Sequence, residues 1–475
     1  MAALVAVVLA PLPAAASGKS TQDARIARIE QNLLPALQVR GRPMTARTLS
    51  GEMALHRTPA LSVAVVDGGR IVWARAYGYA DVAAKTPATT RTLFQAGSVS
   101  KPVAASGAMQ LVQEGKLVLD RPANDQLVSW KIPDSAFTQG DPITLRHLLT
   151  HTAGLTVHGF PGYEAGKPVP TVVQLLEGKP PANTPAVVSD QPPGKVWNYS
   201  GGGITIAQLM ITDVSHESFP ALMRRRVFVP LGMADSTYEQ PLPPERVGAA
   251  ATGYHLDGKP VPGRFHTYPE MAAAGLWTTP TDLAKWAIAL QRAHDGRSAK
   301  LMSKASARTM LTPGLGDWGI GIAVNGQGDA RRFSHGGDDE GFKTTLVGWF
   351  TGGRAVVVMA NGDDSTPLIN EVAQAVAHEY GWKGLEPQVV VPAALSAAQM
   401  QDFAGSYGHG ALKVAVADGR IMLSYAGQTF EAIPLGGDKF IIDGASQAIP
   451  ADAVRGPDGK VKGISAVGLV LNRDP

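Results

Sequence analysis

Residues 94–105, FQAGSVSKPVAA, place a serine and a lysine three positions apart, Ser98 and Lys101. A serine hydroxyl is a weak nucleophile until a nearby base removes its proton. If a helix begins here, both side chains share one of its faces, and the positive end of the helix dipole lies beside the serine. Desolvation favours the neutral amine of a lysine, which can then accept a proton. The pair therefore predicts a nucleophile with its own base. Because Ser-x-x-Lys arises about once by chance in a chain of this length, the alternative is a polar helix start with a solvated lysine.

A tyrosine stands in the segment PPGKVWNYSGGG, residues 192–203. Tyr199 lies between a Pro-Gly turn and a glycine run, which we interpret as a loop rather than a packed environment. A phenol in such a place can relay a proton between a nucleophile and a leaving group if cationic neighbours favour its phenolate. The alternative is an aromatic anchor for a glycine-rich loop.

A histidine followed by two glycines occurs in RRFSHGGDDEGF, residues 331–342. Glycines let a backbone pass close to a ligand. A strand beside the nucleophile could then offer a backbone N–H to a developing oxyanion. This pattern predicts His335, Gly336 and Gly337 at the site, with a turn carrying an exposed histidine as the alternative.

Two further histidines, His147 and His151, lie four positions apart on a predicted helix, as a pair of metal ligands would. The first is followed by Leu148 rather than the glutamate that a zinc hydrolase needs, and no third ligand stands nearby. The sequence therefore predicts no metal site at this pair. The chain also lacks Gly-x-Ser-x-Gly, which argues against a nucleophile elbow.

The elements that must position these residues follow from hydrophobic periodicity. We expect helices over residues 21–38, 144–154 and 367–380, and strands over 61–66, 71–80, 318–324, 343–350 and 354–360. Thr144 is the expected N-cap of the second helix and Gly154 its stop. Strands near both ends with helices between them predict an α+β domain, in which an antiparallel sheet is built from the two ends.

The pattern of apolar and turn residues along the sequence changes after residue 383. We interpret residues 384–396 as a linker, and residues 18–383 as the main domain before it. Residues 397–475 carry short alternating runs separated by Asp-Gly and Gly-Gly turns, which predict a small all-β barrel or curled sheet.

The composition excludes several classes of function. The 475 residues are 44% hydrophobic and 17% charged, with a net charge of +3 and no long basic run. Nucleic acid is therefore not an expected partner, because phosphate neutralisation needs clustered lysine and arginine. The chain has no cysteine, which excludes disulfides, thiol catalysis and cysteine-ligated metals.

Residues 1–17 look like a secretory signal, with an apolar core over residues 2–10 and alanines at 14–16. No basic residue precedes the core, so the start of the signal is incomplete. A membrane anchor is the alternative, but the segment is short and broken by Pro11 and Pro13. We expect a periplasmic or secreted protein without stable membrane insertion.

Taken in order, SVSK, PPGKVWNYSGGG and HGGDDEGF resemble the serine β-lactamase-related hydrolases, which include class C β-lactamases, DD-peptidases, D-amino-acid peptidases and family VIII esterases. ITLRHLLTHTAGL and VFVPLGMADSTY are also typical of that family, and the resemblance covers about residues 50–380. It implies a β-lactamase/transpeptidase-like fold, in which helices flank the sheet and form an all-helical subdomain. The trailing β-module is similar to the lipocalin-like domain of some peptidases and peptide cyclases.

The resemblance implies a two-step acyl transfer without a cofactor. Ser98 would attack a carbonyl and become acylated, while Lys101 helps to remove its proton. Tyr199 would act as general base or acid, and His335 would steer protons or contact substrate. Which of Lys101 and Tyr199 is the main base stays open.

The resemblance also implies an oxyanion hole made by the backbone N–H groups of Ser98 and Asp338, beside Gly336 and Gly337. Two departures from the family bear on the substrate. The family's Tyr-x-Asn ends here in Gly201, and its Lys-Thr-Gly is His-Gly-Gly. Both changes count against an efficient β-lactamase.

The sequence therefore predicts an exported serine hydrolase that cleaves an ester or amide bond of a small or peptide-like substrate. A class C-like β-lactamase or penicillin-binding DD-peptidase is one alternative. A non-hydrolytic sensor of cell-wall peptide or penicillin is another, and a peptide cyclase that uses an amine in place of water is a third.

Overall fold

The computed structural model describes residues 16–43, 47–425, 428–443, 448–466 and 469–475. Most of the predicted signal segment, residues 1–15, lies outside the described residues. The first helix is α1, Ala16–Gln31, and the short strand β1, Leu37–Val39, follows it. The helix predicted over 21–38 therefore ends earlier than expected, because its last two residues belong to a strand. Within the described ranges, no helix combines the length and hydropathy that a membrane crossing needs.

A seven-stranded sheet with the order β4-β3-β2-β10-β9-β8-β7 forms the centre of the molecule. Its strands are β2 Ala60–Asp67, β3 Arg70–Asp81, β4 Thr86–Pro87, β7 Ala323–Asn325, β8 Arg332–Asp339, β9 Phe342–Trp349 and β10 Ala355–Ala360. All the pairings in this sheet are antiparallel, and β2 pairs with β10. The predicted hairpin and the joining of the two ends of the domain are confirmed.

The strand expected over residues 318–324 is largely wrong. Only its last two residues join β7, because Gly321 adopts a left-handed φ of 73°. Gly319 donates its N–H to the carbonyl of Ile322 at 2.8 Å, which folds the segment into a turn.

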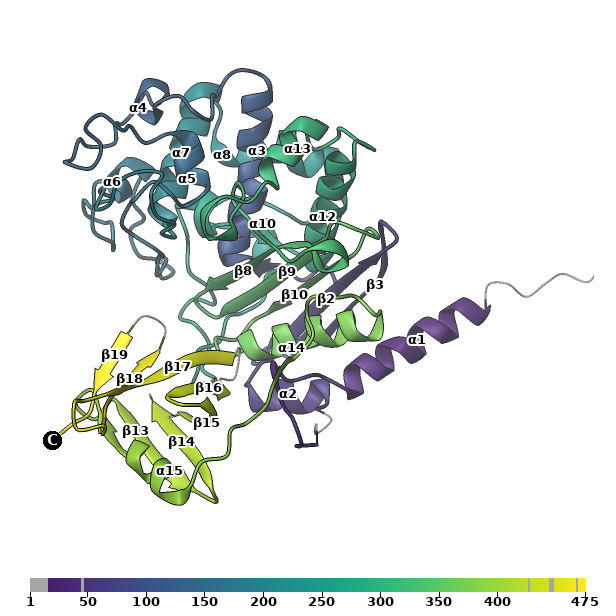
Figure 1. The fold of residues 1–475 in the computed structure, drawn as a ribbon. Helices are drawn as coiled ribbons and strands as arrows, with labels where there is room; N and C mark the ends of the chain where they lie inside the picture. Colours follow the sequence, from purple (N-terminus) through teal and green to yellow (C-terminus); the bar gives the residue numbers. More distant parts are fainter. Residues whose placement is uncertain (1–15, 44–46, 426–427, 444–447, 467–468) are drawn as a thin grey trace, which may run out of the picture.

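Helices cover both faces of the sheet (Figure 1). α14, Thr366–Glu379, lies on one face with α1 and α2, Leu49–Leu55. α12, Pro280–Asp295, covers the other face. Alternate residues of β2 supply the two cores, as the period of a strand requires: Leu61, Val63 and Val65 face α14, whereas Ala60, Ala64 and Val66 belong to the other cluster.

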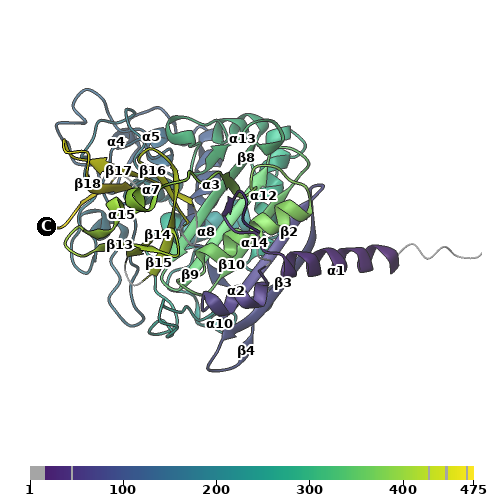
Figure 2. The same cartoon turned by 60° about the horizontal axis from the view of Figure 1, so that its bottom comes forward.

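A helical subdomain fills the chain between β4 and β7, and the rotated view in Figure 2 shows it beside the sheet. Its helices are α3 Ser100–Gln113, α4 Ala123–Gln126, α5 Leu145–Leu149, α6 Val172–Leu176, α7 Gly201–Ser215, α8 Phe219–Met223, α9 Val229–Leu231, α10 Pro244–Val247, α11 Met271–Ala274 and α13 Lys304–Met310. A two-stranded ribbon of β5, Phe94–Gln95, and β6, Trp277–Thr278, lies next to α3. The predicted α+β class is confirmed.

The chain ends in a small β-domain. α15, Ala397–Phe403, precedes eight antiparallel strands that pair in chain order. They are β12 Gly405–Tyr407, β13 Leu412–Ala417, β14 Arg420–Tyr425, β15 Gln428–Gly436, β16 Lys439–Asp443, β17 Ala448–Arg455, β18 Val461–Ala466 and β19 Leu469–Asn472. A bridge between Tyr407 and Arg473 brings the first strand to the last. The predicted barrel is therefore confirmed as a near-closed one.

The N-terminal segment connects this barrel to the main domain. β11, Gln388–Val390, lies inside the predicted linker and pairs in parallel with β1. Ile433 and Ile441 of the barrel pack on this ribbon, and Arg42 donates two hydrogen bonds of 2.7 Å to Glu431. We call β1, β11 and these barrel residues the clasp.

Candidate active site

The chain turns sharply at Ser98, between β5 and α3. A single 3₁₀ turn, Gly97–Val99, leads directly into α3, so Ser98 stands at the start of a helix as predicted. Gly97 has a φ of 51°, and a Cβ atom there would lie 2.4 Å from the backbone nitrogen of Asp338. A Cβ atom at Gly337 would lie 2.0 Å from the carbonyl oxygen of Ala96. Both glycines are thus needed for β8 to pass this close to the serine turn.

Lys101 lies next to Ser98. Its ammonium Nζ donates to Ser98 Oγ at 2.8 Å and to the carbonyl of Ala273 in α11 at 2.7 Å. The lysine is 2% exposed, and its Nζ lies 5.0 Å from the centre of the Tyr199 ring. The alternative of a solvated lysine is therefore wrong, because the side chain is fixed between two acceptors inside the protein.

Two contacts hold the start of α3 in place. The hydroxyl of Tyr238 donates to the carbonyl of Ser100 at 2.6 Å, and Ser100 Oγ accepts the N–H of Leu276 at 3.0 Å. Both Ser100 and Tyr238 are fully buried. They fix the first turn of the helix against the strand that follows α11.

Tyr199 precedes α7, and the glycine run that we interpreted as a loop is the first turn of this helix. Ser200 is its N-cap and accepts the N–H of Gly203 at 3.0 Å. A Cβ atom at Gly201 would lie 2.8 Å from the Phe160 ring. The run therefore lets a buried helix end pack tightly. The Phe160 ring would therefore have to shift for an asparagine, the residue of the family's motif, to stand at position 201.

Four aromatic rings surround Tyr199. The His151 ring lies 4.2 Å from it, Trp318 5.9 Å, and Trp197 and His335 each 6.3 Å, measured between ring centres. Sequence reasoning assigned no role to Trp197 or Trp318, and it considered His151 only as a metal ligand. Neither spacing nor periodicity marks these residues, since they meet only in the tertiary structure.

The metal pair considered for His147 and His151 does not form. α5 begins after Thr144 as predicted but ends at Leu149, and His151 follows in a left-handed conformation with φ 56°. The predicted stop at Gly154 is wrong. His147 Nδ1 accepts the N–H of Thr144 at 3.4 Å, whereas His151 turns toward Tyr199.

His335 lies in the middle of β8 and is 6% exposed, so the alternative of an exposed turn histidine is wrong. Its Nδ1 donates to the carbonyl of Gly336 at 2.6 Å, which leaves Nε2 as the unprotonated nitrogen. Burial and the nearby ammonium of Lys101 lower the pKa of His335 to about 3. The ring is therefore neutral near pH 7.

Two buried carboxyl groups beside this site were missed by sequence reasoning. Asp339 Oδ2 accepts the N–H of Gly97 at 3.2 Å, and burial raises the pKa of Asp339 well above its usual range. Glu270 is fully buried, and neither carboxyl oxygen has a hydrogen-bond partner among the described residues. Burial raises the pKa of Glu270 to about 8, although Lys101 opposes this. Glu270 therefore holds a proton near pH 7.

The predicted oxyanion donors come from adjacent segments. Ser98 belongs to the first helical turn, whose N–H groups lack partners within the helix. Asp338 lies on the strand that passes Gly97. Its carboxylate oxygen Oδ1 accepts a hydrogen bond from Lys343 Nζ at 2.5 Å. The oxyanion role of these two N–H groups stays a prediction.

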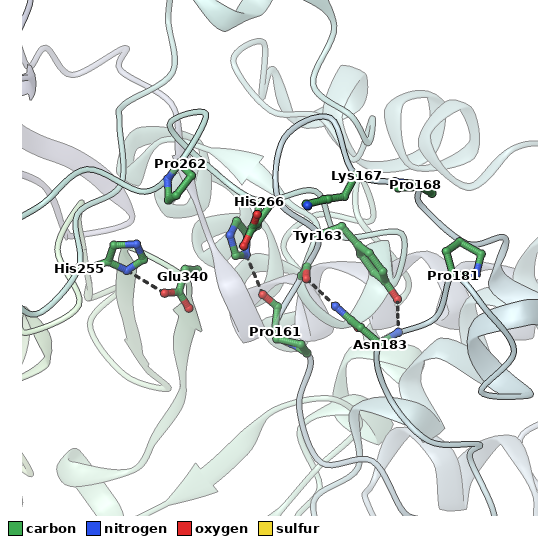
Figure 3. Close-up of a pocket in the computed structure, with 12 residues that line it drawn as sticks. Pro161, Tyr163, Lys167, Pro168, Pro181, Asn183, His255, Pro262, His266 and Glu340 are labelled. Carbon is green, nitrogen blue, oxygen red and sulfur yellow. Dashed lines mark hydrogen bonds and ion pairs between the residues drawn. The ribbon is translucent and has the colours of Figure 1, made fainter.

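The structure contains a cavity of about 550 Å³. Figure 3 draws the residues that line it. Its wall includes Glu340, which follows Asp339 directly, and His266, whose carbonyl accepts the side-chain amide of Gln95 at 2.7 Å. The cavity is therefore built from the segments that hold the serine turn. Its described lining contains none of the four predicted catalytic side chains.

His255 and Glu340 approach each other on the cavity wall in Figure 3, with Nδ1 and Oε1 2.9 Å apart. Asp363 lies 3.5 Å from the same Nδ1 and 3.0 Å from Lys343 Nζ. These three residues could offer ligand atoms to a metal ion, and one of them, Asp363, is also paired with Lys343.

The arrangement is that of a serine hydrolase: Ser98 and Lys101 are in hydrogen-bond contact at the start of a buried helix, and the Tyr199 ring lies beside the lysine. Residues 45–380 match the protein-family model described as Beta-lactamase, and the chain belongs to the β-lactamase family.

Curated relatives are similar at low identity. Penicillin-binding protein 4* of Bacillus subtilis (strain 168) is 25% identical over 344 residues, which are 67% of this chain and 71% of that protein. Esterase EstB of Burkholderia gladioli is 31% identical over 209 residues, 42% of this chain and 50% of that protein.

Solved structures share the fold over most of the chain. The octameric penicillin-binding protein homologue from Pyrococcus abyssi has a TM-score of 0.62 at 23% identity and covers 89% of this chain and 98% of its own. SurE with D-Leu has a TM-score of 0.57 at 25% identity, with coverages of 90% and 97%. The β-lactamase-like fold is thereby confirmed.

Proposed function

We propose that this chain cleaves an ester or amide bond of a peptide-like substrate through an acyl-enzyme on Ser98. The observation that carries the proposal is the 2.8 Å contact between Lys101 Nζ and Ser98 Oγ, in which the lysine is fixed by the carbonyl of Ala273. A base within hydrogen-bond reach of a serine hydroxyl is the geometry that nucleophilic catalysis requires.

In the first step Ser98 Oγ forms a bond to the substrate carbonyl carbon and transfers its proton to the neutral amine of Lys101 or to the phenolate of Tyr199. Backbone N–H groups of Ser98 and Asp338 stabilise the negative charge on the carbonyl oxygen. The carbon–oxygen or carbon–nitrogen bond then breaks, and the leaving group takes a proton from the same relay. Water repeats the sequence on the acyl-enzyme and releases the acid.

Tyr199 supports this relay by its position. The centre of its ring lies 5.0 Å from Lys101 Nζ, which places the phenol beside the group that contacts Ser98 Oγ. His335 stays neutral at working pH and offers Nε2 as an acceptor on the same side of the site. A ring with so low a pKa can accept a hydrogen bond but does not take the proton of Ser98, which leaves Lys101 and Tyr199 as the proposed acceptors.

The choice of an ester or peptide-like bond rests on the relatives and on the two departures from the family's motifs. One relative is named an esterase, and a solved structure of similar fold was determined with D-Leu. The missing asparagine and lysine weaken the contacts that a β-lactam needs, and Phe160 occupies the space of the asparagine. We further propose export to the periplasm or the medium, on the strength of residues 1–17.

Intact mass spectrometry after treatment with a fluorophosphonate probe tests the nucleophile. We expect one adduct on the wild-type chain and none on Ser98→Ala. Ser50→Ala removes an exposed serine and should leave the adduct unchanged. Labelling of Ser98→Ala to the wild-type extent would disprove the assignment.

Turnover assays separate the proposal from its alternatives. We expect a chromogenic ester or a D-aminoacyl anilide to be hydrolysed repeatedly, and a chromogenic cephalosporin more slowly. A lasting penicilloyl adduct without turnover of any substrate would instead support a penicillin-binding sensor. Fast hydrolysis of the cephalosporin alone would support a β-lactamase.

A further inference from the structure

His151 makes three contacts with three consecutive residues of the segment that carries the tyrosine. Its carbonyl accepts the N–H of Asn198 at 2.7 Å, and its Nδ1 accepts the N–H of Ser200 at 3.1 Å. Between these two bonds its ring stacks on Tyr199, with the ring centres 4.2 Å apart and the planes tilted by 34°. One residue therefore holds residues 198–200 by backbone, side chain and ring.

The backbone of His151 is held in an unfavourable conformation to make these contacts. It has a φ of 56°, in the left-handed region that a residue other than glycine rarely adopts. The residue is 1% exposed and lies just beyond the end of α5. Strain of this kind persists where the surrounding structure fixes it, and here the surrounding structure is the tyrosine segment.

The hydrogen bonds of the ring also fix its proton. Because Nδ1 accepts from Ser200, the proton of the neutral ring sits on Nε2. Nε2 is buried and has no hydrogen-bond partner among the described residues. Burial, together with Lys101 on α3 and His335 on β8, lowers the pKa of His151 well below its usual range. A second proton would remove the acceptor for Ser200 and place a cation near Lys101.

We infer that His151 is a positioning residue for Tyr199, which fixes the phenol over Lys101 by stacking on it and by binding the backbone on either side. This inference rests on the proposed function, in which Tyr199 relays the proton. A core histidine without such a role need not contact three successive residues of the site. His151 does not touch the reacting atoms, so its effect passes through Tyr199.

Two substitutions separate the two contacts of the ring. His151→Phe keeps an aromatic ring against Tyr199 but removes the acceptor for the Ser200 N–H. His151→Asn can keep an acceptor near the position of Nδ1 but removes the stacked ring. We expect each to lower kcat for the ester about 10- to 100-fold, with a smaller change in KM, because small displacements of a catalytic group have effects of this size. His147→Gln is the matched control and should retain wild-type kcat.

A double-mutant cycle shows whether the effect passes through the tyrosine. If His151 acts by positioning Tyr199, its substitution should cost less than about threefold in the Tyr199→Phe background, since residues that act as a unit are not additive. Amide hydrogen exchange supplies a readout that does not need turnover. The Ser200 amide should exchange faster in His151→Phe than in the wild type, and it should be unchanged in His147→Gln.

The outcomes distinguish this inference from the proposed function. A wild-type chain that is neither labelled at Ser98 nor active on any ester would overturn the proposed function and this role with it. A labelled and active wild type whose His151 variants keep wild-type kcat would overturn the positioning role alone. So would full additivity with Tyr199→Phe, or a Ser200 amide that exchanges at the wild-type rate in His151→Phe. If His151→Phe fails to fold by thermal melting, His151→Asn carries the same cycle.

Discussion

At the scale of single residues, burial sets the charge of the site. Burial lowers the pKa of His335 to about 3, raises the pKa of Glu270 to about 8, and raises the pKa of Asp339 well above its usual range. The Ser98–Lys101 pair thus lies among groups that add little charge of their own. If the backbone N–H groups of Ser98 and Asp338 form the proposed oxyanion hole, they act in a buried setting where hydrogen-bond donors have a stronger effect than in water.

Lys101→Met tests the base at this scale. The substitution keeps most of the buried volume but removes the group that contacts Ser98 Oγ. We expect kcat for the ester to fall at least about 100-fold, because general bases contribute about 10²–10⁴ in rate. Stopped-flow or steady-state ester hydrolysis measures this, with Lys116→Met, an exposed lysine, as the control. A kcat near the wild-type value would remove Lys101 from the mechanism.

Glu270→Gln tests whether the buried carboxyl group of Glu270 keeps its proton in the folded chain. The folded-state pKa of about 8 exceeds the usual value of 4.5, so between these pH values the folded chain keeps a proton that the unfolded chain has released. The contribution of Glu270 to the free energy of unfolding therefore decreases as pH rises from about 4.5 to 8, by up to about 1.4 kcal/mol per pH unit.

Urea unfolding at several pH values measures this slope. We expect Glu270→Gln to flatten the decrease relative to the wild type and to be the more stable of the two at pH 8. Glu245→Gln changes an exposed glutamate on α10 and should follow the wild-type curve. Parallel curves for Glu270→Gln and wild type would mean that the carboxyl is ionised in the folded chain.

At the scale of elements, the hydrophobic periodicity of the sequence predicted the strands and helices whose apolar residues repeat regularly. The β2–β3 hairpin, β9, β10 and α14 follow the expected ranges closely. The errors fall where glycines or tertiary contacts decide the backbone. The run before Ile204 starts a helix rather than a loop, and α5 ends early because His151 turns toward Tyr199.

The same limit applies to the site. The order of motifs predicted that Ser98, Lys101, Tyr199 and His335 meet, and the structure brings them together. Glu270, Asp339 and His151 gain their properties from burial and from neighbours far away in the sequence. No spacing rule could have identified them.

Gly97→Ala tests the approach of β8 to the serine turn. The added Cβ atom would meet the backbone of Asp338 at 2.4 Å, and backbone atoms cannot move aside as a flexible side chain can. Gly115→Ala is the matched control, because it has a similar positive φ of 71° with nothing within 4 Å of the Cβ position.

Both variants carry the cost of a positive φ, so the difference between them isolates the contact. We expect Gly97→Ala to lower the free energy of unfolding by about 1–3 kcal/mol more than Gly115→Ala, the usual cost of overpacking. Ester hydrolysis should fall in Gly97→Ala only, because the serine turn and Asp338 move apart. Equal losses of stability in the two variants would contradict the close approach.

At the scale of the whole molecule, the clasp attaches the barrel to the main domain. The barrel has its own apolar core around Phe403 and Phe440, which does not include Ile433. Ile433 and Ile441 instead pack on β1 and β11. The attachment of the barrel and its internal stability therefore rest on different residues, and each can be changed separately.

Ile433→Asp should release the barrel without unfolding it. The side chain is fully buried in the clasp, and an unpaired carboxylate there costs several kcal/mol. Leu435→Asp, on the same strand but 41% exposed, is the matched control. Limited proteolysis should cut Ile433→Asp within residues 384–396 at protease levels that leave the wild type and the control intact.

Ester hydrolysis by the variant should stay near the wild-type rate, since the contacts of Ser98 lie within the main domain. If the barrel also shapes substrate choice, the hydrolysis of larger peptide-like substrates should change in Ile433→Asp alone. Resistance to proteolysis equal to that of Leu435→Asp would show that the clasp does not hold the barrel.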